Sequence, residues 1–251
     1  PLTNYEDYQK HFQRSLKTKI NPFSGEKVHF WVNSTGTTGK YKTMPITDAV
    51  ERDMRDFSSV RFAQLIKAYN ILSTAPEIIF VLPGESQGEN KELPIGVTGY
   101  YHYKKMPIFL EKNFVFTKAL YANEDLYNRW YLLMALLSDT SGISTPVPAK
   151  ITHFLTEINS KREELLNHLD QDDWPKELAH SVSPERISML KVLLKEPIKD
   201  IRKVWPSLSF VCVWMAGESC SRQVEELRDR YSFENVDFID QGFTSSEGTF
   251  N

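Results

Sequence analysis

The feature that most restricts the fold lies near the C-terminal end, where a β-prone run, a helical pattern and a second β-prone run follow in close order. Residues 208–215 are mostly apolar, residues 219–231 have helical periodicity, and residues 236–239 are again β-prone. Strand, helix and strand in this order indicate a βαβ unit with a buried sheet. The chain is therefore predicted to have an α/β fold.

Helical and strand patterns continue through the rest of the chain. Thr3 and Glu6 form a capping-box pattern before a helix over residues 3–17, and Asn123 is a favoured N-cap for residues 124–138. Pro184 occupies the favoured first helical position of residues 183–195. Further helices are expected over residues 47–72 and 149–169, and strands over residues 28–32, 78–82 and 95–101.

Composition excludes several classes of protein. The 30 Lys and Arg nearly balance the 33 Asp and Glu, so no overall field favours nucleic acid or an anionic membrane as a partner. The apolar runs fall far short of the roughly 20 residues that span a bilayer, so we expect no membrane segment. Cys212 and Cys220 are too few for a disulfide framework, and neither they nor the six histidines have metal-ligand spacing. A cytoplasmic location fits best.

A small, polar segment directly follows the expected strand 28–32. Its glycines let the backbone approach a ligand, while N–H groups and hydroxyls can point at phosphate oxygens. Its glycine spacing, and Tyr41 after the lysine, distinguish it from a Walker A loop. The segment is either a different phosphate-binding loop or an ordinary exposed turn. Its residues are Ser34, Thr35, Gly36, Thr37, Thr38, Gly39 and Lys40.

A second polar segment follows the expected strand 236–239. Ligands of open α/β sheets bind beyond the carboxyl ends of strands, where a carboxylate and hydroxyls could reach a nucleotide and Mg²⁺. Taken alone, a carboxylate after a strand is more often a cap or a solvated loop residue. The segment consists of Phe243, Thr244, Ser245, Ser246, Glu247, Gly248, Thr249 and Phe250.

Together, the two segments resemble the motifs of the auxin-responsive acyl acid amido synthetases, the Gretchen Hagen family of adenylate-forming enzymes. The resemblance also includes residues 5–8, 205–208 and the glycine-containing turn 215–219, and so covers nearly the whole chain. It implies the large N-terminal domain of such an enzyme, with β-sheets packed against helices. We expect residues 1–251 to be a partial ATP- and acyl-binding domain, incomplete at both ends and without the small C-terminal domain.

The resemblance implies a two-step reaction that depends on ATP and Mg²⁺. A carboxylate attacks the α-phosphate of ATP and expels pyrophosphate, and the amine of an amino acid then attacks the acyl adenylate and releases AMP. Residues 34–40 would hold the phosphates, with Thr37 taking part in catalysis. Ser245 and Ser246 would line the nucleotide and acyl site, and Glu247 would help position Mg²⁺. Phe243 and Phe250 would flank the adenine, next to Thr244 and Gly248.

Two departures leave substrate details open. Phe243 stands where the family usually has Tyr, and Glu218 stands where it commonly has a small residue. The acyl pocket could include Trp130, Met134 and Leu137, or residues 151–155, although such residues are more often plain core.

Two alternatives also remain: a ligase that passes the acyl group to coenzyme A, and a non-catalytic relative with the same fold. This chain alone is expected to be a poor catalyst. The sequence does not identify the acid, the amine or the oligomeric state.

Overall fold

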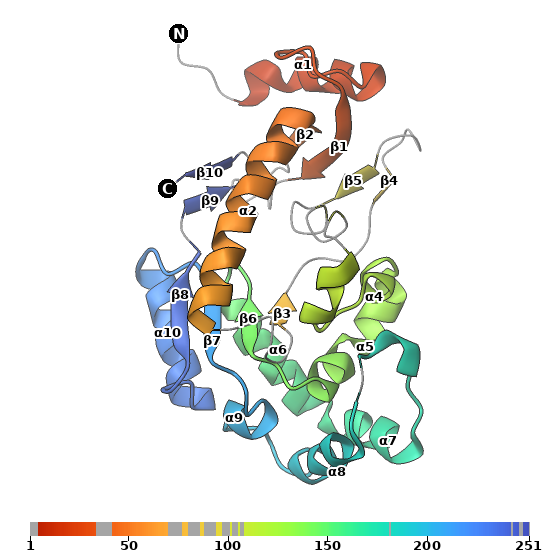
Figure 1. Ribbon diagram of the computed structural model, residues 1–251, viewed down its shortest axis with the longest axis vertical. Helices are drawn as coiled ribbons and strands as arrows, with labels where there is room; N and C mark the ends of the chain where they lie inside the picture. The colour runs from red at the N-terminus through yellow and green to blue at the C-terminus, as the bar shows by residue number, and fades with distance from the viewer. Residues whose placement is uncertain are drawn as a thin grey trace. The chain divides into compact units, whose positions relative to one another are not determined.

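The computed structural model describes residues 5–33, 42–69, 77–79, 86–87, 94–96, 101, 105, 108–180, 182–241, 243–245 and 248–250 (Figure 1). Contacts within the chain divide it into two compact units. Unit 1 consists of residues 1–64, 82–106 and 243–251, and unit 2 of residues 65–81 and 107–242. Both units combine helices with sheets, which confirms the predicted α/β class.

Unit 1 contains a four-stranded mixed sheet in the order β2-β1-β5-β4. The expected strand 28–32 is β1 (Val28–Asn33), which pairs antiparallel with β2 (Thr43–Thr47) and parallel with β5 (Pro94–Gly96). The fourth strand is β4 (Ser86–Gln87). We did not predict β2 because it contains Pro45. The proline is tolerated since β2 lies at the edge of the sheet, where a missing N–H breaks no ladder.

The helices α1 (Tyr5–Thr18) and α2 (Asp48–Tyr69) confirm the two expected near the N-terminus. On the inner face of α1, Phe12 and Leu16 pack against Val28 and Trp31 of β1. Both β1 side chains are fully buried. The helix therefore holds β1 in place through a small apolar core, to which Ile95 also contributes.

Unit 2 is built on a parallel sheet in the order β3-β6-β7-β8. Its strands are β3 (Glu77–Ile79), β6 (Gly142–Ser144), β7 (Phe210–Val213) and β8 (Asp237–Asp240). The helix α10 (Glu218–Tyr231) connects β7 to β8, so the predicted βαβ unit is confirmed. We did not predict β6, because its three residues are too short for a pattern.

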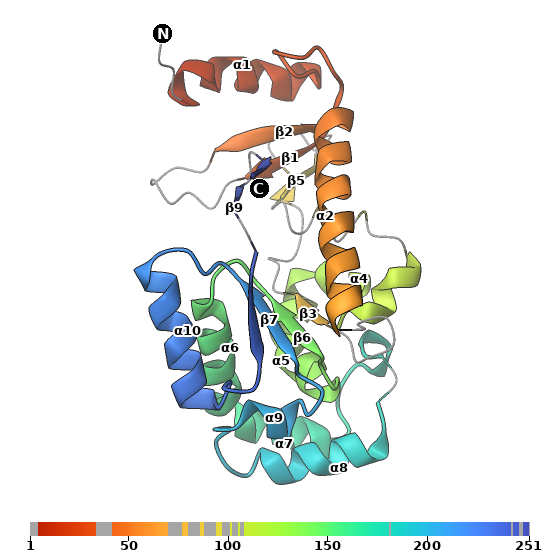
Figure 2. The same cartoon turned by 60° about the vertical axis from the view of Figure 1, so that its left-hand side comes forward.

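Helices surround this sheet. Figure 2 shows α6 and α10 side by side, and Gln223 of α10 accepts a hydrogen bond from the backbone N–H of Ala149 at 3.1 Å. The helices described between residues 108 and 204 are η1 (Ile108–Asn113), α4 (Lys118–Tyr121), α5 (Glu124–Leu137), α6 (Ala149–Ser160), α7 (Arg162–Gln171), η2 (Lys176–Leu178), α8 (Pro184–Leu193) and α9 (Ile201–Val204).

The single helix expected over residues 149–169 is two helices, α6 and α7, separated at Lys161. Lys161 has φ −102° and ψ 10°, outside the helical region. The Ser160 hydroxyl donates to the Glu157 carbonyl, and Arg162 donates to the Asn159 carbonyl. These side chains satisfy carbonyls at the end of α6 and so stabilise the break, which apolar periodicity alone did not reveal.

One arginine joins three segments of unit 2. The Arg186 guanidinium donates to the carbonyl oxygens of Leu136, Ser138 and Val204. Burial lowers the pKa of Arg186 to about 10, so the side chain is still charged at neutral pH. The planar group suits several carbonyls at once, and it satisfies the last carbonyls of α5 and α9.

Position 142 of β6 requires glycine, because the Phe210 ring of β7 lies close to its backbone. A Cβ atom at this position would lie 2.1 Å from Cζ of Phe210 in β7. Phe210 is fully buried, and the Tyr69 ring lies 4.7 Å from it, centroid to centroid. The phenyl ring of Phe210 therefore occupies the space that any larger residue at 142 would need.

Candidate functional site

The first predicted motif lies between two paired strands of unit 1. β1 ends at Asn33 and β2 begins at Thr43, and these two residues are paired in the antiparallel ladder. The Thr43 hydroxyl donates to Oδ1 of Asn33 at 2.9 Å. The motif residues Ser34, Thr35, Gly36, Thr37, Thr38, Gly39 and Lys40 lie outside the described residues. The structure thus gives the two strand ends that the motif connects.

A β-bulge and a side-chain hydrogen bond mark the other end of this hairpin. The β1–β2 register shifts between Val28 and Phe30, which leaves His29 as the extra residue. Nε2 of His29 lies 2.8 Å from Oδ1 of Asp48 in the first turn of α2. A bulge re-aims a side chain, and here the pair links β1 to the start of α2.

A polar cluster lies beside α2 in the same unit. The Tyr101 hydroxyl donates to Glu51, and Nζ of Lys105 lies 3.5 Å from Oε2 of Glu51. Burial and the hydrogen bond to Glu51 raise the pKa of Tyr101. The Tyr101 ring also packs against Phe30, with centroids 4.8 Å apart. Tyr101 therefore stays protonated and acts as a hydrogen-bond donor that connects α2 to β1.

The second predicted motif forms a hairpin. β9 (Phe243–Ser245) pairs antiparallel with β10 (Gly248–Phe250), with Ser245 opposite Gly248. Ser246 and Glu247 connect these strands and lie outside the described residues. We expected a loop here and did not predict the two short strands. The strands β1 and β2, which flank the first motif, and the strands β9 and β10 of the second motif all belong to unit 1.

The glycine-containing turn 215–219, which is part of the family resemblance, lies at the carboxyl edge of the parallel sheet in unit 2. The turn 214–217 leads from β7 to α10, and Gly217 has φ +90°. This φ value favours glycine. The Met215 N–H donates to Oδ1 of Asp240, the last residue of β8. The edge therefore has a glycine turn and a helix N-terminus, as ligand sites of parallel sheets do.

Sequence reasoning did not single out three other polar residues at this edge. Nε2 of Gln241 donates to the Cys212 carbonyl at 2.9 Å and to the Ser144 hydroxyl at 3.2 Å. The Thr145 hydroxyl is buried and has no hydrogen-bond partner within the described part of the chain. Such an unpaired group is costly and marks a candidate ligand contact. The sequence signal that could have identified these residues is their position at or directly after the ends of strands.

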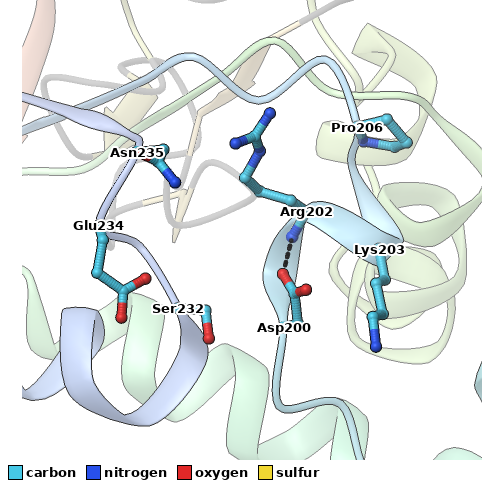
Figure 3. Close-up of a pocket in the computed structure, with 7 residues that line it drawn as sticks. All are labelled: Asp200, Arg202, Lys203, Pro206, Ser232, Glu234 and Asn235. Atoms are coloured by element: carbon cyan, nitrogen blue, oxygen red, sulfur yellow. Dashed lines mark hydrogen bonds between the residues drawn. The ribbon is translucent and has the colours of Figure 1, made fainter.

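A hollow of ≈ 330 Å³ lies elsewhere on unit 2 (Figure 3). Its lining residues precede β7 and β8 in the chain and therefore lie near the amino ends of these strands. The Asp200 side chain caps α9 by accepting from the Arg202 N–H at 3.1 Å. The hollow is therefore at the wrong end of the sheet for a nucleotide. It is lined by Asp200, Arg202, Lys203, Pro206, Ser232, Glu234 and Asn235.

Most of the residues considered for an acyl pocket lie in the core, although His153 is exposed. Trp130, Met134 and Leu137 of α5 are buried, as are Ile151 and Leu155 of α6. The structure therefore favours their interpretation as packing residues.

Within the described ranges, no group of three or more His, Cys, Asp or Glu side chains is placed to hold a metal ion. In the same ranges, no helix is both long and apolar enough to cross a bilayer.

Comparisons with known proteins agree with the resemblance. A family model described as "GH3 family N-terminal domain" matches residues 1–229. A solved structure titled "GH3.15 acyl acid amido synthetase" matches with a TM-score of 0.77 and 18% identity over 98% of this chain. A second, "AtGH3.15 acyl acid amido synthetase in complex with 2,4-DB", matches with a TM-score of 0.78 and 16% identity, again over 98% of this chain.

This chain spans 46% of the length of each of these two structures. No curated protein sequence matches it significantly. At these identities, the two structures establish the fold alone. The family match covers most of the chain, and it shows that this protein belongs to the GH3 family.

Proposed function

We propose that this chain provides the ATP-binding part of an acyl acid amido synthetase. The observation that carries the proposal is that a GH3-family chain contains both predicted nucleotide motifs, and that the described strands next to them belong to one compact unit. The solved structures that share its fold are described as acyl acid amido synthetases, which supports the same activity here. Because the chain spans under half of those proteins, the complete reaction needs residues outside positions 1–251.

In this proposal, the reaction has two steps. A carboxylate oxygen of the acid attacks the α-phosphorus of ATP, and pyrophosphate leaves. The amine of an amino acid then attacks the acyl carbon, which forms the amide and releases AMP. In-line displacement requires positioning and charge neutralisation more than a protein nucleophile. Residues 34–38 and Lys40 supply hydroxyls, backbone N–H groups and positive charge for this purpose.

The hairpin residues have distinct proposed roles. Ser245 and Ser246 contact the nucleotide and the acyl group, Phe243 and Phe250 flank the adenine, and Thr37 orients the phosphates. Glu247 and the phosphate oxygens form an oxygen donor set that suits Mg²⁺. When bound, Mg²⁺ neutralises charge on the phosphates. We place the activity in the cytoplasm, which fits the two free cysteines, Cys212 and Cys220.

The test is acid-dependent exchange of labelled pyrophosphate into ATP by the full-length protein. A pooled panel of aryl, indole and fatty acids should support exchange above the control without acid. Amino acids should then yield amides, detected by mass spectrometry. Formation of coenzyme A thioesters instead would assign the protein to the acyl-CoA ligases, and ATP binding without exchange for any acid would indicate a non-catalytic relative.

A further inference from the structure

The two strands that carry the phosphate-binding segment are joined by a side-chain hydrogen bond at their ends. Asn33 is the last residue of β1 and Thr43 the first of β2, and they form the last pair of the antiparallel ladder. The Thr43 hydroxyl donates to Oδ1 of Asn33 at 2.9 Å, and both residues are part-buried. The bond therefore adds a side-chain link where the backbone ladder ends.

The neighbouring residues make this link rigid. Trp31 and Val32 precede Asn33 and are fully buried, and Trp31 packs in the core beneath α1. On the other strand, Ile46 is buried one residue before the end of β2. Because the core holds both strands, the Asn33–Thr43 bond fixes the distance between the points at which the chain leaves and re-enters the sheet.

We propose that Asn33 and Thr43 form a clamp that positions the phosphate-binding segment for ATP. Ser34 follows Asn33 directly, and nine residues, 34–42, separate the clamp partners. In general, fixing the two ends of a loop lowers the conformational entropy that ligand binding costs. The clamp residues are positioning residues, since they act through the segment rather than on the reacting atoms. This inference rests on the proposed function.

The experiment compares variants of the full-length protein for MgATP binding by calorimetric titration. Thr43→Val preserves shape but removes the donor, and should raise the Kd for MgATP by about fivefold, the size that one hydrogen bond supplies. Thr43→Ser retains the hydroxyl and should restore the Kd. In pyrophosphate exchange, the KM for ATP should rise with little change in kcat or in the KM for the acid.

A double-mutant cycle tests the pairing itself. If Asn33 and Thr43 act as one unit, Asn33→Ala combined with Thr43→Val should bind ATP no more weakly than either single variant. The matched control is Thr156→Val in unit 2. It also removes a hydrogen-bonded hydroxyl, because Oγ1 of Thr156 lies 3.2 Å from the Tyr231 hydroxyl oxygen. It should leave the Kd unchanged.

Three outcomes would overturn the inference. Unchanged ATP affinity in Thr43→Val, with the wild-type protein binding ATP, would contradict the clamp alone. Equal weakening by Thr43→Val and Thr156→Val would show a general loss of stability instead. Absence of ATP binding by the wild-type protein would contradict the proposed function and the clamp together.

Discussion

The two units of the chain use β-structure in different ways. Unit 2 has a parallel sheet whose inner strand β7 is completely buried, with helices that pack closely around it. In unit 1, the hairpin β1–β2 flanks a segment rich in hydroxyls and glycine, and the hairpin β9–β10 flanks Ser246 and Glu247. The difference indicates that unit 2 supplies most of the packing, while the proposed chemistry lies in the connections of unit 1.

If this comparison is correct, Gly142→Ala should have the largest effect on stability. The added Cβ would overlap Phe210, which cannot move freely because Tyr69 packs against it. We expect a loss of about 3 kcal/mol in the free energy of unfolding, measured by urea denaturation. Adding Phe210→Leu should recover part of the loss. No loss in the single variant would show that unit 2 is less tightly packed than its contacts indicate.

A smaller loss should follow from Gln241→Glu at the carboxyl edge of the sheet. The substitution replaces the amide donor with a carboxylate that faces the Cys212 carbonyl and the Ser144 hydroxyl. We expect a loss of about 1–2 kcal/mol at pH 7. The loss should shrink at pH 4, because a protonated carboxyl can donate again. A loss that does not depend on pH would rule out the amide hydrogen bonds as its cause.

The smallest effect is expected for Glu157→Gln in α6. Burial alone would raise the pKa of Glu157, but hydrogen bonds from Lys161 and Tyr131 hold it below its ordinary value of 4.5. A lowered carboxyl pKa contributes stability that is present at neutral pH and is lost as the pH falls through it. Glu157→Gln should therefore cost under about 1 kcal/mol at pH 7, and this cost should shrink as the pH falls below 4.5. Glu163→Gln, at an exposed site in α7, is the matched control.

The sequence was most informative where apolar periodicity was long. The two strands and the helix around residues 210–240 were predicted to within two residues at each end, since buried strands and amphipathic helices leave clear patterns. Short elements such as β6 and β9 left no pattern. The break at Lys161 depends on side-chain hydrogen bonds, which periodicity does not contain.

For the candidate site, the sequence identified the residues of the two motifs, but it did not identify the polar residues outside the motifs. The glycines and hydroxyls of residues 34–40 were compatible with phosphate binding, which the family resemblance then implied. Asn33 and Thr43 became candidates only once their pairing was known. Gln241 and Thr145 are likewise single polar residues whose positions matter only in the folded sheet. The site residues within 34–40 and 243–250 remain predictions.

The most direct test of the division between the two units is the pyrophosphate exchange rate of Glu247→Gln in the full-length protein, compared with Glu234→Gln at the exposed hollow of unit 2. We expect Glu247→Gln to lower acid-dependent exchange by about 100-fold without changing the melting temperature, and Glu234→Gln to leave exchange unchanged. Equal exchange rates in the two variants would contradict the proposal that the connections of unit 1 carry the chemistry.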